Sequence, residues 1–259
     1  MSLPMRVLLS NDDGIQSPGL LALKRAFERN GHLVTVCAPD RPRSASGHSI
    51  TLHKPLRMVK TTLADGSEAW AASGTPTDCT TLGLLEIAPN EIDLVVSGIN
   101  HGPNLGWDVT YSGTVSVAME AVIIGVPAIA VSMTSYADIR HWETAADFVA
   151  GKLAPSVCAY GLPPATLINV NVPDLPEDEI TGVKLCIQGD RQYVDRVEKR
   201  FDPLGRPYFW LGGKIHAKET AEGTDVHEVG QGYIAVTPIH LDMTAYAFLE
   251  EMKAWNIER

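Results

Sequence analysis

Short apolar runs alternate with longer segments of helical spacing over the first two thirds of the chain. Segment 6–10, RVLLS, has the apolar character of a buried strand, and segment 18–30 places its apolar residues at near-helical intervals. Pro18 suits a first helical turn, and Gly31 follows as a stop signal. These two segments predict a βα unit, and the apolar segment 32–38, HLVTVCA, predicts a second strand.

The same alternation continues in the middle of the chain. We predict strands over 92–97, 126–132 and 165–172, and helices over 112–125 and 141–154. A chain that alternates strands with helices favours a parallel sheet covered by helices on both faces. The expected fold class is therefore α/β, with a Rossmann-like, doubly wound and mostly parallel sheet.

The pattern changes after about residue 183. Segment 192–213 has two extended stretches, both charged and aromatic, around the turn sequence DPLGRP at 202–207. It predicts a projecting C-terminal β-hairpin arm with the aromatic residues Tyr193, Phe201, Tyr208, Phe209 and Trp210. Such an arm would expose apolar area unless another subunit covered it. We therefore favour an oligomerisation arm over a lid or an extra sheet within the monomer.

These patterns divide the chain into three regions. We expect residues 5–183 to form the α/β core, which would also carry any catalytic site, 184–232 to form the projecting hairpin and oligomerisation region, and 233–259 to form a final strand and C-terminal helix. We expect the strand at 233–238 and the helix at 244–255 to return to the core.

Charge and composition exclude some classes of partner. The 259-residue chain carries a formal net charge of −10, which opposes binding to nucleic-acid polymers. A small anionic substrate stays possible where a metal ion or a helix terminus supplies positive potential. The longest apolar stretch, 121–133, is shorter than the roughly 20 residues of a membrane span, and the first four residues lack a signal-peptide pattern.

The cysteines indicate a reducing compartment. They are widely spaced, mostly lie in or beside apolar runs, and form no zinc-binding pattern. We expect all four to be reduced core residues of a cytoplasmic protein: Cys37, Cys79, Cys158 and Cys186.

Polar side chains follow the ends of three predicted strands. Asp12 and Asp13 follow the first strand, and Ser44 lies in the loop after the second. Asn100 lies in segment 98–104, which is too rich in glycine and asparagine to continue its strand. Because the carboxyl ends of parallel strands gather at one edge of the sheet, we expect these side chains to converge. Their oxygen atoms suit one hard divalent cation, Mg²⁺ or Mn²⁺, which would also neutralise the adjacent acids.

A helix is predicted to begin beside this edge. Ser112 or Thr114 would cap it, and the backbone N–H groups of its first turn, including Gly113, would form a phosphate cradle. Each feature also has a plain interpretation, since Asp-Asp-Gly is a common solvated turn and serine a common cap. Their shared location favours a metal-assisted phosphoryl hydrolase.

Motifs of other enzyme classes are absent from the sequence. The first strand is not followed by GxGxxG, and neither a P-loop nor a GxSxG motif occurs. The two acids are contiguous, which disfavours an aspartyl-nucleophile phosphatase with Asp-x-Asp. His101 lies in a candidate loop and could contact substrate, whereas the roles of His48 and His240 stay open.

Five longer motifs carry a family resemblance. They are RVLLSNDDGIQSPGL at 6–20, APDRPRSASGHSITL at 38–52, SGTPTDC at 73–79, VSGINHGPNLGWDVTYSGTVSVAMEA at 96–121 and GYIAVTPIHLDMT at 232–244. In this order they resemble the stationary-phase survival protein SurE family of metal-dependent nucleotidases. The resemblance implies a Rossmann-like core, an exchanged C-terminal hairpin, and a homodimer or homotetramer.

The resemblance also implies an activity and a set of site residues. Members of the family hydrolyse nucleoside 5'- and 3'-monophosphates, and some also trim short polyphosphate. The family's metal ligands fall on Asp12, Asp13, Ser44 and Asn100, and positions near the phosphate fall on Asn104 and Ser112. Ala45 stands where many relatives have glycine, which is expected to alter the flexibility of the Ser44 loop.

The resulting hypothesis is a metal-dependent phosphomonoesterase. Asn104 and Ser112, with the backbone of Gly113 and Thr114, would hold the phosphate for attack by water. Asp12 would orient or deprotonate that water, and an aspartyl-phosphate on Asp12 is a less favoured variant. The alternative is a non-catalytic nucleotide- or phosphate-sensing module, which the two adjacent acids disfavour because they repel an anion unless a metal ion is present.

Overall fold

The computed structural model describes residues 4–216, 221–255 and 257. The strands are β1 (Arg6–Ser10), β2 (Leu33–Pro39), β3 (Met58–Thr62), β4 (Glu68–Ala72), β5 (Leu94–His101), β6 (Ala128–Met133), β7 (Thr166–Val172), β8 (Gly182–Leu185), β9 (Gln192–Phe201), β10 (Pro207–His216) and β11 (Tyr233–His240). The α-helices are α1 (Pro18–Arg29), α2 (Pro76–Leu82), α3 (Gly113–Ile124), α4 (Trp142–Phe148), α5 (Ala154–Tyr160), α6 (Asp225–Gly230) and α7 (Tyr246–Met252).

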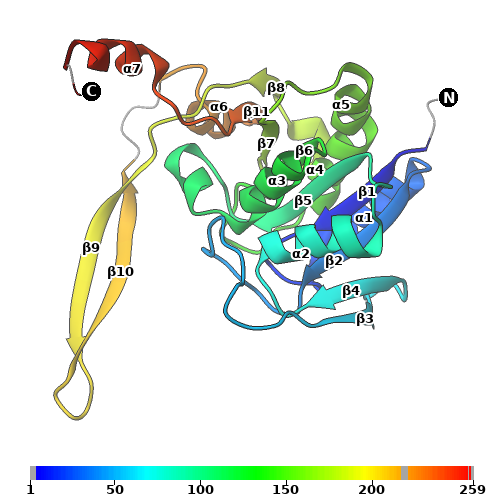
Figure 1. Cartoon of the computed structure of the whole chain (residues 1–259), viewed down its shortest axis with the longest axis horizontal. Coiled ribbons are helices and arrows are strands. Elements are labelled where there is room, and N and C mark those ends of the chain that lie inside the picture. The colour runs from blue at the N-terminus through cyan, green and yellow to red at the C-terminus, as the bar shows by residue number, and fades with distance from the viewer. Residues whose placement is uncertain (1–3, 217–220, 256, 258–259) are drawn as a thin grey trace.

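One large sheet organises the chain. Its strand order is β3-β4-β2-β1-β5-β6-β7-β11-β8, and β9 and β10 form a separate two-stranded sheet (Figure 1). Neighbouring strands from β4 to β7 run parallel, whereas β3 and β4 pair antiparallel, as do β7 and β11. The predicted α/β fold, with a mostly parallel sheet and a projecting hairpin, is confirmed.

Helices cover both faces of the sheet and create two hydrophobic cores. Successive strand residues point to opposite faces, so Val7 and Leu9 contribute to one core and Leu8 to the other. Helices α1 and α4 pack on the first face, with Phe27 fully buried, and α2 and α3 pack on the second. This alternation explains why the central strands are apolar throughout.

Two central elements extend further than predicted. Strand β5 continues through the glycine-rich segment to His101, with a register shift between Ser97 and Asn100. The glycine marks an irregularity rather than an end, because Gly98 adopts a φ of 127° and a Cβ there would lie 2.3 Å from the carbonyl oxygen of Val131. The helix predicted to end at 154 instead continues to Tyr160 through wider π-type turns over Val149–Leu153.

The C-terminal region divides between core and periphery. Strand β11 lies in the core sheet between β7 and β8, and β8 crosses the predicted region boundary at residues 183 and 184. The expectation that the last helix returns to the core is wrong. Helix α7 has no buried residue and lies apart from the sheet (Figure 1), so its apolar side chains, among them Phe248 and Leu249, stay half exposed. Residues 256, 258 and 259 of the predicted terminal region lie outside the described residues.

The hairpin of β9 and β10 projects away from the core (Figure 1). It exposes apolar side chains along its length: Val197, Phe201, Leu204, Tyr208, Phe209, Trp210 and Leu211. The side chain of Tyr193, predicted with this set, lies outside the described part of the structure. The arm therefore has an apolar surface that the described part of the chain leaves uncovered.

Three of the four cysteines are buried as predicted, but Cys158 is exposed, because it lies on the outer side of α5. All four are free thiols. Among the described residues, no helix has the length and apolar character needed to cross a bilayer. Residues 1–3, considered above for a signal peptide, lie outside the described residues.

Candidate functional site

A cavity of about 340 Å³ lies where β1 and β5 end. It brings together five of the side chains predicted for the site: Asp12, Ser44, Asn100, Asn104 and Ser112. The parallel sheet explains this convergence, because the loops that follow neighbouring strands meet at one edge. The cavity wall also contains side chains outside the predicted set, namely Asp108, Tyr111 and Tyr136.

Asp12 is the most deeply buried acid of the predicted set. Only 4% of the residue is exposed, and burial raises the pKa of its carboxyl to about 6. A hydrogen bond from the Thr114 hydroxyl to Oδ1 partly opposes this shift, whereas the charge of Asp13 adds to it. Gly113 packs directly on Asp12, since a Cβ at that position would lie 2.7 Å from the Asp12 Cβ. The start of α3 is therefore fitted against this carboxylate.

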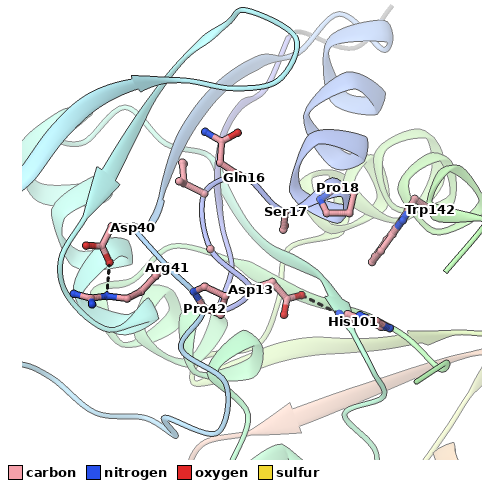
Figure 2. A pocket seen from close by; sticks show the side chains of 11 residues that line it. Asp13, Gln16, Ser17, Pro18, Asp40, Arg41, Pro42, His101 and Trp142 are labelled. Carbon is pink, nitrogen blue, oxygen red and sulfur yellow. Dashed lines mark hydrogen bonds and ion pairs between the residues drawn. The ribbon is translucent and has the colours of Figure 1, made fainter. Parts of the chain in front are cut away.

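Asp13 lies at the border of a second cavity of about 350 Å³ (Figure 2). Its Oδ2 accepts a hydrogen bond of 2.9 Å from the backbone N–H of His101, and burial raises its pKa. His101 lines both cavities, so it lies between them. The structure thus places the two adjacent acids next to one edge but facing different cavities. Trp142 and Arg41 form walls of the second cavity.

The loop that carries Ser44 is anchored on both sides. The backbone N–H of Arg43 donates to the carbonyl oxygen of Asp12 at 2.7 Å, and that of Gly47 donates to the carbonyl oxygen of Tyr111 at 3.1 Å. Between these anchors, Ala45 adopts a φ of 55°, in the left-handed region that favours glycine. Glycine at this position would avoid the steric cost that Ala45 incurs.

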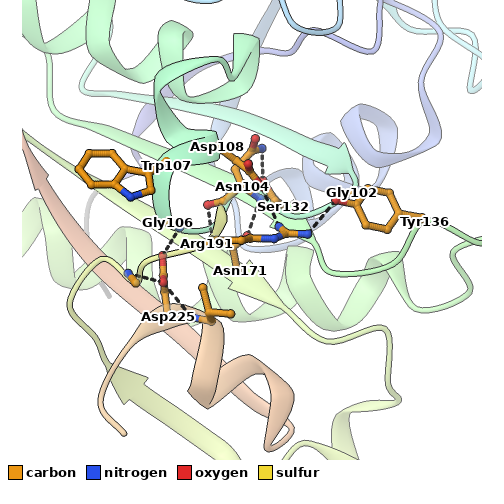
Figure 3. A network of polar contacts seen from close by, with 12 residues as sticks. Gly102, Asn104, Gly106, Trp107, Asp108, Ser132, Tyr136, Asn171, Arg191 and Asp225 are labelled. Carbon is orange, nitrogen blue, oxygen red and sulfur yellow. Dashed lines mark hydrogen bonds and ion pairs between the residues drawn. The ribbon is translucent and has the colours of Figure 1, made fainter. Parts of the chain in front are cut away.

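Asn100 and Asn104 are held by different means. The Nδ2 of Asn100 donates to the carbonyl oxygen of Gly102 at 2.8 Å, which orients the amide and makes its Oδ1 the atom suited to a cation. Asn104 is held more firmly, because its backbone N–H donates to Asn171 and its carbonyl oxygen accepts from Asn169 and Asn171. Its Nδ2 also donates to the Ser132 hydroxyl at 2.7 Å, as Figure 3 shows.

Ser112 is the N-cap of α3, as one of the two predicted alternatives requires. Its Oγ accepts from the backbone N–H of Val115 at 3.0 Å, which leaves the hydroxyl hydrogen able to donate into the cavity. Gly113 and Thr114 follow Ser112 in the first turn of α3. Neither lines the cavity, and the Thr114 side chain contacts Asp12.

Sequence reasoning missed several residues that build the site. Asn169 and Asn171 are fully buried in β7 and hold the Asn104 backbone. Two asparagines at alternate positions of an apolar strand could have been identified from the sequence. Such residues share one face of the sheet, and buried amides require hydrogen-bond partners. Asp108 and Arg191 gave no local signal, since they form their ion pair across 83 positions.

The donor set fits a hard cation. Carboxylate, hydroxyl and amide oxygens are the ligands that Mg²⁺ and Mn²⁺ prefer, and a cation beside the two adjacent acids would favour their ionised forms, which burial disfavours. Among the described residues no group of three or more His, Cys, Asp or Glu side chains gathers for a metal, so Ser44 and Asn100 would have to complete the set. The open cases His48 and His240 contact Glu120 and Asp242, outside both cavities.

Comparisons with known proteins agree with this geometry. The family model described as survival protein SurE matches residues 7–195. A protein of Heliobacterium modesticaldum named 5'-nucleotidase SurE is 48% identical over 97% of this chain and 92% of its own length. A protein of Geobacter sulfurreducens with the same name is 48% identical over 98% of this chain and 94% of its own.

A solved structure agrees as well. The crystal structure of the SurE protein from Aquifex aeolicus is 43% identical, covers 96% of this chain and 99% of its own, and superposes with a TM-score of 0.83. Sequence and fold therefore agree over nearly the whole chain, and the protein belongs to the survival protein SurE family.

Proposed function

We propose that this protein hydrolyses nucleoside 5'- and 3'-monophosphates, and also short polyphosphate, with one divalent metal ion per subunit. It is a 5'-nucleotidase of the SurE family, since relatives of that name are 48% identical over nearly its full length. One observation links the proposed activity to particular residues. A single cavity gathers the buried Asp12 with Ser44, Asn100, Asn104 and Ser112.

In this proposal Asp12, Asp13, Ser44 and Asn100 hold Mg²⁺ or Mn²⁺. When bound, the ion offsets the negative charge of the phosphate and lowers the pKa of a bound water. The fit rests on the chemistry of the donors, which are all oxygen atoms, and on the burial of Asp12 beside a second acid. Asp13 lies at the border of the second cavity, next to His101, which lines both cavities.

The remaining residues bind the phosphate and handle the proton. The free hydroxyl hydrogen of Ser112 and the Nδ2 of Asn104 are the donors that the cavity offers to phosphate oxygens. Because the Asn104 backbone is held by two buried asparagines, its amide is presented in a fixed position. Gly113 and Thr114 contribute through the position of α3 and the contact with Asp12. Asp12 is the carboxylate that orients or deprotonates the attacking water.

A sensing module without turnover is the competing function. Two adjacent acids next to an anion-binding cavity oppose metal-free binding of phosphate, so a metal-independent sensor would not be built in this way. The names of the relatives also refer to an enzyme.

Assembly and location complete the proposal. The exposed apolar residues of the arm would be covered in a homodimer or homotetramer. A cytoplasmic location is consistent with four free thiols.

The experiment is phosphate release from a panel of nucleoside 5'- and 3'-monophosphates. Activity should vanish in EDTA and return with Mn²⁺ or Mg²⁺, and mass spectrometry should find no phosphorylated Asp12. Nucleotide binding without metal and without turnover would instead support the sensor. A trapped phosphoenzyme would replace water attack by attack from Asp12 itself.

A further inference from the structure

The wall of the candidate cavity contains a carboxylate that the proposed chemistry does not use. Asp108 lies on the short 3₁₀ helix Gly106–Thr110, between Asn104 and Ser112, and it lines the same cavity as both. A phosphate monoester carries up to two negative charges at neutral pH. An uncompensated carboxylate in this wall would therefore oppose substrate binding by like-charge repulsion.

Arg191 supplies the compensating charge. Its Nη1 lies 2.8 Å from Oδ2 of Asp108, and the two side chains are only 5% and 13% exposed. Its Nη2 donates to the hydroxyl of Tyr136 at 3.0 Å, and Tyr136 is another part of the cavity wall (Figure 3). Arg191 itself is not a lining residue of the cavity. It acts on the site through two residues that are.

The segment around Arg191 also holds the 3₁₀ helix in place. Gln188 donates to the carbonyl oxygen of Gly106 at 2.7 Å, and the Trp107 indole N–H donates to Asp190 at 3.1 Å. A Cβ at Gly106 would lie 2.6 Å from the carbonyl oxygen of Gly189, so the two backbones touch. Strand β9 of the arm begins at the residue that follows Arg191. Residues 188–191, which precede β9 and are called the root of the arm below, thus pack against the cavity wall.

We propose that Arg191 is a positioning residue that neutralises Asp108, so that the cavity accepts a phosphate dianion. The inference rests on the proposed phosphomonoesterase function and adds a residue outside the predicted metal and phosphate sets. Arg191 does not line the cavity, so it would act on a bound phosphate through Asp108. Its effect is electrostatic and lies in substrate binding rather than in the chemical step.

The test compares four test variants and one control variant of the full-length protein with wild type. Arg191→Met removes the charge, and Arg191→Lys keeps it. The double variant Asp108→Asn with Arg191→Met removes both charges of the pair, and Asp108→Asn alone leaves the arginine. Arg200→Met is the matched control, because Arg200 forms an exposed ion pair with Glu198 on the same arm.

Steady-state kinetics with a nucleoside monophosphate and Mn²⁺ should separate KM from kcat. Arg191→Met should raise KM about tenfold, which corresponds to about 1.4 kcal/mol, while kcat changes less than KM. Arg191→Lys and the double variant should restore KM to within about threefold of wild type, and Asp108→Asn alone should not raise it. Binding of inorganic phosphate, measured by calorimetry with Mn²⁺ present, should follow the same order. Arg200→Met should match wild type.

Two results would overturn the inference. A KM that stays high in the double variant would mean that Arg191 acts on binding by a route other than the charge of Asp108. A KM raised by Asp108→Asn alone would mean that the pair is only structural. Asp108→Asn keeps the shape of the side chain, so it provides a test even where Arg191→Met fails to fold. The proposed function fails by a different result, which is that wild type releases no phosphate. In that case the ranking of the variants by their binding of inorganic phosphate still tests the inference.

Discussion

The hydroxyl of Thr114 donates a hydrogen bond to Oδ1 of Asp12, which ties the start of α3 to the end of β1 across 102 positions of the chain. This bond stabilises the ionised carboxylate, but it does not offset burial. The pKa of Asp12 is raised to about 6, mainly by burial and further by the charge of Asp13. The metal-free site therefore holds a carboxylate whose ionisation the fold opposes.

This conflict predicts a stabilising effect of Asp12→Asn in the metal-free protein. The folded pKa of about 6 lies above the usual value of 3.8, so the folded state binds more protons than the unfolded state between about pH 4 and 6. Wild-type stability therefore falls as pH rises through this window. At pH 7 in EDTA, Asp12→Asn should raise the free energy of unfolding by about 1–3 kcal/mol, and the gain should disappear near pH 4.

Urea titrations from pH 4 to 8 measure this difference, and Asp65→Asn is a control of opposite sign. Hydrogen bonds from Ser67 and the nearby Lys24 lower the pKa of Asp65 to about 2. Its ionised form therefore stabilises the folded state above about pH 4, and Asp65→Asn should lower stability at pH 7. Equal stability of Asp12→Asn and wild type across the whole range would contradict the burial argument.

Asp13→Asn addresses metal binding. The substitution removes a negative charge from the proposed metal site, while the side-chain carbonyl oxygen of the introduced amide can still accept from the His101 N–H. We expect the Mn²⁺ concentration for half-maximal activity to rise at least about tenfold. Because burial raises the pKa of Asp13, the thermal unfolding temperature of the metal-free protein should stay the same or rise. Asp40→Asn is the control, because Asp40 lines the same second cavity but is not in the proposed ligand set. Unchanged metal dependence in Asp13→Asn would remove Asp13 from that set.

Ala45→Gly tests the left-handed residue beside Ser44. Glycine avoids a steric cost of about 1–2 kcal/mol at this φ but loses about 0.5–1 kcal/mol in backbone entropy, so a net gain of about 0.5 kcal/mol is expected. Because the Ser44 loop becomes less preorganised, the Mn²⁺ requirement should rise about threefold.

Ala165→Gly separates these two effects. Ala165 has the same φ of 55° but lies outside the cavity. Ala165→Gly should therefore raise the free energy of unfolding by as much as Ala45→Gly does, and it should leave the Mn²⁺ requirement at the wild-type value. Chemical denaturation and metal titration of both variants give the comparison. An equal rise of the Mn²⁺ requirement in both would mean that preorganisation of the Ser44 loop is not its cause.

Much of the fold was predictable because it rests on local periodicity. The apolar run of β1 and the spacing of α1 carry their own start and stop signals, and both elements form close to the predicted bounds. The extension of β5 beyond Gly98 was not predictable in this way. It depends on the approach of that residue to the carbonyl oxygen of Val131, which only the neighbouring strand supplies.

Only part of the candidate site was predictable from the sequence. Strand order alone brings Asp12, Ser44 and Asn100 to one edge, so their convergence follows from the topology. The pairing of Asp108 with Arg191 depends instead on how the root of the arm folds back on the core, and no local pattern in the sequence encodes that path. Asp13 faces a neighbouring cavity for a similar reason, because its orientation is set by the backbone of His101.

The arm offers the last prediction, which concerns assembly. Trp210 and Leu211 on β10 are 60% and 85% exposed. Exposure of this apolar surface to water is unfavourable, and burial against another subunit would remove that cost. Light scattering after size exclusion should give wild type a mass that is a multiple of 28.0 kDa, and Trp210→Glu with Leu211→Glu should shift it toward one subunit. Tyr160→Glu is the control, because Tyr160 is at least as exposed, at 90%, but lies on α5 of the core. Wild type that stays monomeric at micromolar concentration, or a control that dissociates as readily as the arm variant, would contradict an arm-mediated assembly.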